Sequence, residues 1–108
     1  MNQWGRNDLI TENETDDNGN PLGGTVIGPG IRIQWQNGPL GRPPKEPNGA
    51  FVEDLIEAAR QRLAYYQVGK FSCRENALAI TKLEEALHWL HARRMGREAR
   101  GVQGENKP

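Results

Sequence analysis

An amide side chain lies where an amphipathic helix should carry an apolar residue. The stretch FSCRENALAITKLEEALHWLHARR, residues 71–94, has the apolar spacing of a single helix, and Asn76 falls within its apolar stripe. A buried amide without partners costs about 1–3 kcal/mol. Two interpretations are open. Asn76 either bonds a backbone group of the helical hairpin, or it contacts a ligand that donates and accepts at once, such as the edge of a purine.

Aromatic residues flank this amide. Tyr65 and Tyr66 end the preceding helical pattern, and Phe71 opens the next one. A ring beside an amide at a chain reversal suits base stacking combined with reading of the base edge. Tyr66 and Phe71 are therefore candidate stacking residues, and for any single ring the alternative is packing in the hydrophobic core.

Arg93 and Arg97 are four residues apart, which places them on one face of a helix. Two guanidinium groups on one face can bind phosphate oxygens, although arginines near a helix C-terminus also favour the helix dipole. Asn76 lies 17 residues before Arg93, about 25 Å along a helix. One small ligand cannot contact both within a chain, but an antiparallel dimer would bring Asn76 of one protomer to the arginines of its partner.

Other chemistries find little support. Glu85 and His88 have the Glu-x-x-His spacing of di-iron proteins, but they point away from the apolar stripe, which argues against a metal site. Cys73 has no obvious histidine base, which favours a small core residue. Phosphate-binding glycine loops, dinucleotide fingerprints and nucleophile elbows are missing. We expect a binding protein without a cofactor rather than an enzyme.

Charge is unevenly distributed along the 108 residues, although the formal net charge is zero. Residues 1–20 carry five acidic side chains against one arginine, and residues 86–108 carry five basic side chains against two acidic ones. A local basic end suits a small anionic partner better than a long nucleic acid or a membrane surface. With one cysteine and no apolar run of about 20 residues, the composition predicts a cytosolic location.

Hydrophobic periodicity predicts an α+β protein. Ile31, Ile33 and Trp35 alternate with polar residues, as in a half-buried strand. In chain order we expect a polar, flexible tail (1–23) and one domain (24–108) made of a β-hairpin (24–37), a loop (38–49), a helix (50–67), a second helix (72–96) and a tail (97–108). Asn48 is the expected N-cap of the first helix, and Ser72 with Glu75 the capping box of the second.

The second helix carries apolar residues on two faces. One face should pack on the first helix as an antiparallel hairpin, and Leu78 and Trp89 lie on the opposite face. Because the core is also short for a lone domain, we expect a homo-oligomer.

From Ile31 onward the sequence resembles the phage family of Thoeris anti-defence protein one, over about 80 of the 108 residues. The matching stretches are IQWQNGPLG, PNGAFVEDLIEAARQRLAYYQ, GKFSCRENALAITKLEEALHWLHARR and REARGVQG. The resemblance implies a non-enzymatic sponge. Such a protein binds cyclic ADP-ribose isomers made by immune TIR enzymes, chiefly glycocyclic ADP-ribose, and holds them uncleaved.

The resemblance also implies an assembly and a set of ligand residues. Relatives share a helical-hairpin domain with the phage anti-CBASS sponges, and some form hexamers, as trimers of dimers, with separate pockets for cyclic di- or trinucleotides. By motif position Asn76, Arg93 and Arg97 are similar to the family's ligand residues, with Tyr66 or Phe71 as the aromatic partner. Arg74 matches a second, trimer-centred pocket.

Two further function classes stay open. The chain could be a helical-hairpin oligomerisation module without a ligand, or a small ferritin-like metal-binding protein. A hydrolase acting on the cyclic nucleotide is a variant of the sponge, but the sequence offers no clear pair of base and nucleophile.

Overall fold

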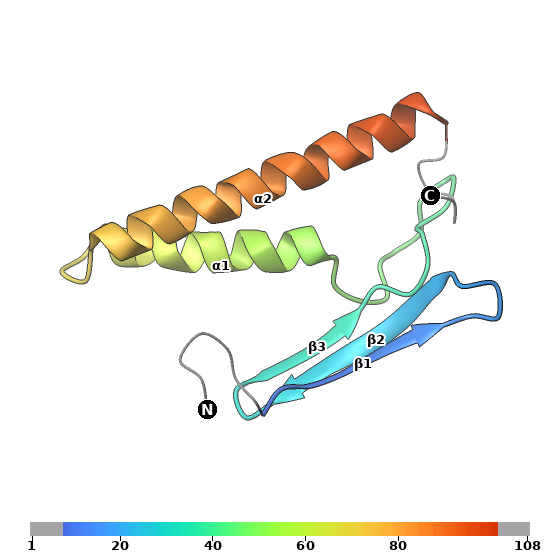
Figure 1. Ribbon diagram of the computed structural model, residues 1–108, viewed down its shortest axis with the longest axis horizontal. Coiled ribbons are helices and arrows are strands. Elements are labelled where there is room, and N and C mark those ends of the chain that lie inside the picture. The colour runs from blue at the N-terminus through green and yellow to red at the C-terminus, as the bar shows by residue number, and fades with distance from the viewer. Residues whose placement is uncertain (1–7, 102–108) are drawn as a thin grey trace. The chain divides into compact units, whose positions relative to one another are not determined.

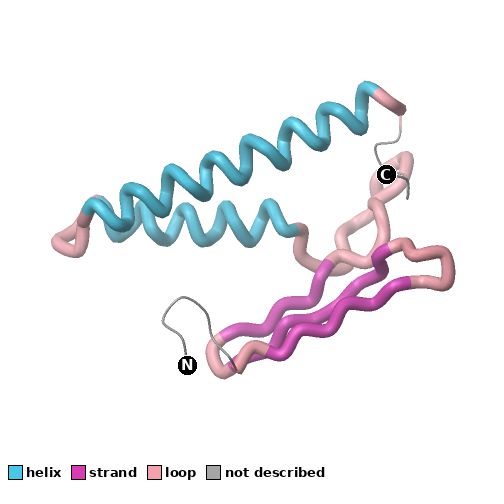
Figure 2. Tube along the Cα trace, in the orientation of Figure 1, coloured by secondary structure: helices cyan, strands magenta, loops and turns pink. Residues whose placement is uncertain are grey.

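The computed structural model describes residues 8–101, and the chain divides after Phe51 into two compact units. The first contains a β-sheet and the second contains two helices, labelled in Figure 1 and coloured by type in Figure 2. The α+β class predicted from the sequence is therefore confirmed.

The sheet has three antiparallel strands in the order β1-β2-β3, where the sequence predicted a two-stranded hairpin. The strands are β1 (Ile10–Thr15), β2 (Pro21–Gly28) and β3 (Ile31–Trp35). The expectation of a flexible tail over residues 1–23 is wrong for residues 10–23, since these residues form β1, the turn after it and the start of β2. Residues 1–7 of the expected tail lie outside the described residues. β1 forms although all six of its residues are exposed, so its backbone pairing with β2 outweighs its polar composition.

A tight turn around Asp16 joins β1 to β2. One carboxylate oxygen of Asp16 accepts hydrogen bonds from the backbone N–H groups of Asn18 and Asn20, both at 2.9 Å. The backbone N–H of Asn20, above all, lowers the pKa of Asp16. Gly19 takes the left-handed conformation that the turn requires, with φ of 82°. The Asp-Asn-Gly composition at this point therefore marks a hairpin turn.

The buried part of the sheet is small. Val26 of β2 lies directly opposite Ile33 of β3, and each is only 9 % exposed. Within residues 8–101 these two are the only buried hydrophobic side chains. The alternation of Ile31, Ile33 and Trp35 with polar residues thus predicted β3 correctly.

A clamp of polar side chains closes the loop after β3. The side chain of Asn48 accepts a hydrogen bond from the backbone N–H of Asn37 at 2.8 Å and donates to its carbonyl at 3.1 Å. Gln36 accepts from the backbone N–H groups of Asn48 and Gly49, at 2.8 and 3.2 Å. Gly49 must be a glycine because any Cβ would collide with the carbonyl of Trp35. The prediction that Asn48 caps the first helix is therefore wrong: its side chain closes the loop instead.

The two helices are α1 (Val52–Gln67) and α2 (Arg74–Ala99), close to the predicted ranges 50–67 and 72–96. Glu53 and Asp54 lie in the first turn of α1, where negative charge favours the helix dipole. The helices lie side by side as a hairpin (Figure 1). On α2, the half-buried residues between Asn76 and Leu90 recur at helical spacing: Asn76, Ala79, Ile80, Leu83, Ala86, Leu87 and Leu90.

Neither helix, as described, contains a buried residue. With 16 and 26 residues, α1 and α2 are about 24 Å and 39 Å long, and the end of α2 runs past the start of α1 (Figure 1). The hairpin alone thus buries none of its apolar side chains fully.

Candidate functional site

Asn76 lies at the closed end of the helical hairpin, in the first turn of α2. Its side-chain nitrogen donates a hydrogen bond to the backbone carbonyl of Phe71 at 3.3 Å. Of the two interpretations of Asn76, the bond to a hairpin backbone group is therefore confirmed. A carbonyl can only accept, so the amide nitrogen faces Phe71 and the side-chain oxygen is directed away. This oxygen has no hydrogen-bond partner among the described residues, which leaves an acceptor for a ligand.

The N-cap of α2 is Cys73, and its side-chain sulfur accepts a 3.4 Å hydrogen bond from the backbone N–H of Asn76. The capping box expected from Ser72 and Glu75 is therefore wrong by one residue. The interpretation of Cys73 as a core residue is also wrong, because Cys73 is exposed.

The aromatic candidates lie on the outside of the hairpin end. Phe71 is 70 % exposed and Tyr66 is 36 % exposed, so core packing does not explain Phe71. The guanidinium of Arg62 lies 5.0 Å from the ring centroid of Tyr66 and 5.2 Å from that of Tyr65. Arg62 also donates to the Tyr66 hydroxyl at 3.1 Å. Phe71 also has a cation nearby, since Lys70 Nζ lies 5.7 Å from its ring centroid. Phe71 is nevertheless the more exposed ring, and so the more accessible one for stacking.

The sequence reasoning did not single out Arg62. Its spacing of three and four residues from Tyr65 and Tyr66 is the signal that predicts the contact. A cation beside exposed rings at the hairpin end adds positive potential where an anionic ligand would approach.

Arg93 and Arg97 occupy the opposite end of α2. Arg93 is exposed and Arg97 is half-buried in the last turn of the helix. Because α2 is continuous from Arg74 to Ala99, Asn76 and Arg93 lie about 25 Å apart along its axis. A single chain thus brings Asn76 and Phe71 together but leaves Arg93 and Arg97 at the far end of the helix. Arg74, the residue assigned to a second pocket, is the exposed first residue of α2.

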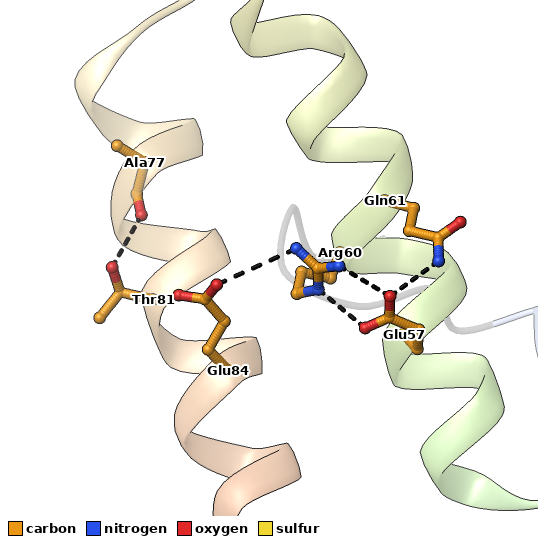
Figure 3. A network of polar contacts seen from close by, with 6 residues as sticks. All are labelled: Glu57, Arg60, Gln61, Ala77, Thr81 and Glu84. Carbon is orange, nitrogen blue, oxygen red and sulfur yellow. Dashed lines mark hydrogen bonds and ion pairs between the residues drawn. The ribbon is translucent and has the colours of Figure 1, made fainter.

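A polar network holds the middle of the hairpin (Figure 3). Arg60 donates two hydrogen bonds of 2.7 Å to Glu57, and its guanidinium lies 3.9 Å from Glu84 of α2. Gln61 adds a third hydrogen bond to Glu57 at 2.7 Å. The hydrogen bonds from Arg60 and then from Gln61 lower the pKa of Glu57 to about 2. Since Arg60 and Glu57 are only partly buried and Glu84 is exposed, solvent screens these interactions, and the network orients the helices more than it stabilises them.

Two large apolar side chains face outward from α2. Trp89 is 72 % exposed and Leu78 is 46 % exposed. They are separated by 11 residues, about three helical turns, and therefore share one face. An exposed apolar stripe on a helix is typical of an interaction surface.

The described residues offer no ligand set for the metal alternative. Between residues 8 and 101, no three His, Cys, Asp or Glu side chains are grouped so as to hold a metal ion. In the same part of the chain, neither helix combines the length and the apolar character needed to cross a membrane.

Comparison with known proteins points to the same segment as the geometry. A family model described as "Acb2/Tad1, hairpin domain" matches residues 29–94. A curated protein of Bacillus phage SBSphiJ7, named "Thoeris anti-defense 1", is 57 % identical over 60 residues, which cover 56 % of this chain and 42 % of the relative. The match thus covers less than half of that relative's length.

Proposed function

The chain belongs to the Acb2/Tad1 hairpin-domain family, and on this premise we propose that it binds and sequesters a cyclic ADP-ribose-type signal without cleaving it. By removing the signal inside the infected or lysogenic host cell, the protein would block Thoeris anti-phage defence. The family membership confirms the resemblance seen in the sequence. The name of the phage relative, "Thoeris anti-defense 1", supports the anti-defence role.

The main structural support is the arrangement of Asn76 and Phe71. Asn76 presents a side-chain oxygen without a partner among the described residues, next to an aromatic side chain that is 70 % exposed. An acceptor beside an open ring suits a purine, which stacks through its face and donates through an exocyclic amine. Glycocyclic ADP-ribose carries an adenine and a pyrophosphate, so it matches both this end of the hairpin and the arginines of α2.

The pyrophosphate would be held by Arg93 and Arg97 of a partner subunit. Along the same helix, Arg93 lies about 25 Å and Arg97 about 32 Å from Asn76, too far for one small ligand. Two chains arranged antiparallel would place the arginines of one protomer beside Asn76 of the other. The ligand site therefore requires a homo-oligomer, at least a dimer and, by analogy with relatives, a hexamer.

A second site for cyclic di- or trinucleotides is part of the proposal. Arg74 is exposed at the start of α2, and its guanidinium can bind a phosphate bidentately. Assembly around a three-fold axis would bring three copies of Arg74 together.

Incubation with glycocyclic ADP-ribose followed by heat denaturation tests the proposal. Recovery of intact ligand in the supernatant, after its depletion from solution before heating, is the result expected of a sponge. A cleaved product would instead identify a hydrolase. No depletion, together with no shift of the melting temperature by cyclic di- or trinucleotides, would favour an oligomerisation module without a ligand.

A further inference from the structure

Gln67, the last residue of α1, makes a two-point contact with Cys73, the N-cap residue of α2. Its side-chain oxygen accepts from the backbone N–H of Cys73 at 2.9 Å, and its side-chain nitrogen donates to the carbonyl of Cys73 at 3.1 Å. Both ends of one amide thus bind both polar groups of one residue, as in a pair of β-strands. This contact ties the end of α1 to the N-cap of α2.

Two further contacts connect this tie to the candidate ligand residues. The sulfur of Cys73 accepts from the backbone N–H of Asn76, and the Asn76 side chain bonds the carbonyl of Phe71. Cys73, the residue that Gln67 contacts, therefore lies within the short loop of chain that the hydrogen bond between Asn76 and Phe71 closes. A shift of Cys73 would move Asn76 and Phe71 relative to each other.

The backbone bonds of the turn do not replace this tie. They join Val68 to Tyr65, Gly69 to Tyr66 and Ser72 to Gly69, at 3.2–3.3 Å. Each spans only three residues, so these bonds shape the turn locally without reaching from α1 to Cys73. The turn also contains exposed Val68 and Phe71, 85 % and 70 % accessible to solvent, and packing on the chain's own core contributes little to its position.

We propose that Gln67 is a positioning residue of the ligand site, which fixes Asn76 and Phe71 in the geometry that binds the nucleotide; this inference rests on the proposed function. Gln67 does not itself touch the ligand. Its action passes through the backbone of Cys73 to the side chain of Asn76.

Gln67→Met removes both hydrogen bonds at nearly constant side-chain shape. By calorimetric titration with glycocyclic ADP-ribose, we expect the Kd of this variant to rise about ten-fold, as when a residue that supports a ligand-contacting group is lost. Gln67→Glu keeps the acceptor for the Cys73 N–H but sets a carboxylate against the carbonyl, and it should also weaken binding. Gln61→Met is the matched control, because Gln61 contacts Glu57 on α1 and not the turn; its Kd should stay within about two-fold.

A double-mutant cycle separates positioning from a general effect on folding. If Gln67 acts through Asn76, Gln67→Met should add little to the affinity loss of Asn76→Ala, whereas independent effects would add. Without ligand, the NMR signal of the Asn76 side-chain amide in Gln67→Met should be shifted from its position in the wild-type protein. In Gln61→Met it should stay at the wild-type position.

The possible failures are distinguishable. Wild-type protein that binds none of the ligand overturns the proposed function and this inference with it. Wild-type binding that Gln67→Met leaves within two-fold, or a cycle in which the two losses add, overturns the role of Gln67 alone. Loss of helical circular dichroism in both Gln67 variants would make Gln67 a folding residue and would also overturn it.

Discussion

The side-chain nitrogen of Asn76 lies 3.3 Å from the backbone oxygen of Phe71, and this hydrogen bond determines which end of the amide faces outward. One N–H of the Asn76 amide is used inside the turn, and the side-chain oxygen is left as an acceptor for a ligand. A donor on the ligand, such as the exocyclic amine of adenine, is therefore the natural partner of this oxygen.

Replacing that amine tests the role of Asn76. A hypoxanthine analogue of glycocyclic ADP-ribose carries a carbonyl in place of the amine, so two acceptors would face each other. We expect it to bind the wild-type protein at least about ten-fold more weakly than the adenine form, the usual cost of a lost base-edge contact. In Asn76→Ala both forms should bind weakly and with similar Kd. Equal affinity of the wild-type protein for the two bases would contradict recognition of the amine.

Glu57 should make stability depend on pH in the acid range. Hydrogen bonds from Arg60 and Gln61 lower its pKa from 4.5 to about 2 in the folded protein, so the unfolded chain takes up a proton first as the pH falls. The contribution of this network is then fully present above about pH 4.5 and is lost progressively towards about pH 2. Thermal unfolding followed by circular dichroism should show a smaller fall of Tm over this range in Glu57→Gln than in the wild type.

Glu46→Gln is the control for that measurement. It removes an exposed carboxylate from the loop before α1 and leaves Glu57, Arg60 and Gln61 unchanged. Its Tm should fall with pH as steeply as that of the wild type. If Glu57→Gln and the wild type lose Tm in parallel, the hydrogen bonds to Glu57 do not persist in solution.

Trp89 should lie in an interface between subunits. It is 72 % exposed in the single chain and shares a face with Leu78, so Trp89→Glu would place a charge in a dry contact. Light scattering coupled to size exclusion should show a homo-oligomer for the wild type and a smaller species for Trp89→Glu. Ala77→Glu, at an exposed position on another side of α2, should keep the wild-type mass. A wild-type protein of 12.1 kDa at micromolar concentration would contradict the two-chain site.

Sequence patterns predicted the elements with strong periodicity. Helical spacing indicated α1 and α2 to within three residues at every end, and the alternation from Ile31 to Trp35 indicated β3. The strand β1 was missed because its residues, ITENET, are polar and exposed. Such a strand is stabilised by backbone pairing with β2, and no side-chain pattern reports that pairing.

The candidate site was only partly predictable for a related reason. An amide in the stripe of α2 marked Asn76, but the partner of that amide depends on the path of the turn. The contacts of Gln67 with Cys73 span six residues without helical or strand periodicity, so no spacing rule indicates them. Asn48 was expected to cap α1 because Asn is a common N-cap, yet its side chain reaches back to Asn37 once the loop closes.

Mixing two inactive variants gives the strictest test of the composite site. Asn76→Ala and Arg97→Ala should each raise the Kd enough to abolish sequestration of glycocyclic ADP-ribose at limiting protein concentration, without changing the oligomer. A lost base-edge contact costs about 1–3 kcal/mol, and a lost contact to a charged phosphate about 1.5–3 kcal/mol. If each pocket combines Asn76 of one protomer with Arg97 of its antiparallel partner, a mixed dimer has one pocket with both lesions and one with neither. Subunit exchange should therefore restore about one working pocket per mixed dimer, measured as ligand depleted from solution.

The matched control mixes the single variant Asn76→Ala with the double variant that carries both Asn76→Ala and Arg97→Ala. In this mixture every pocket carries a lesion, so no activity should return. A mixture of the single variants that stays inactive, despite exchange verified by native mass spectrometry, would show that the two residues do not form one pocket across two chains.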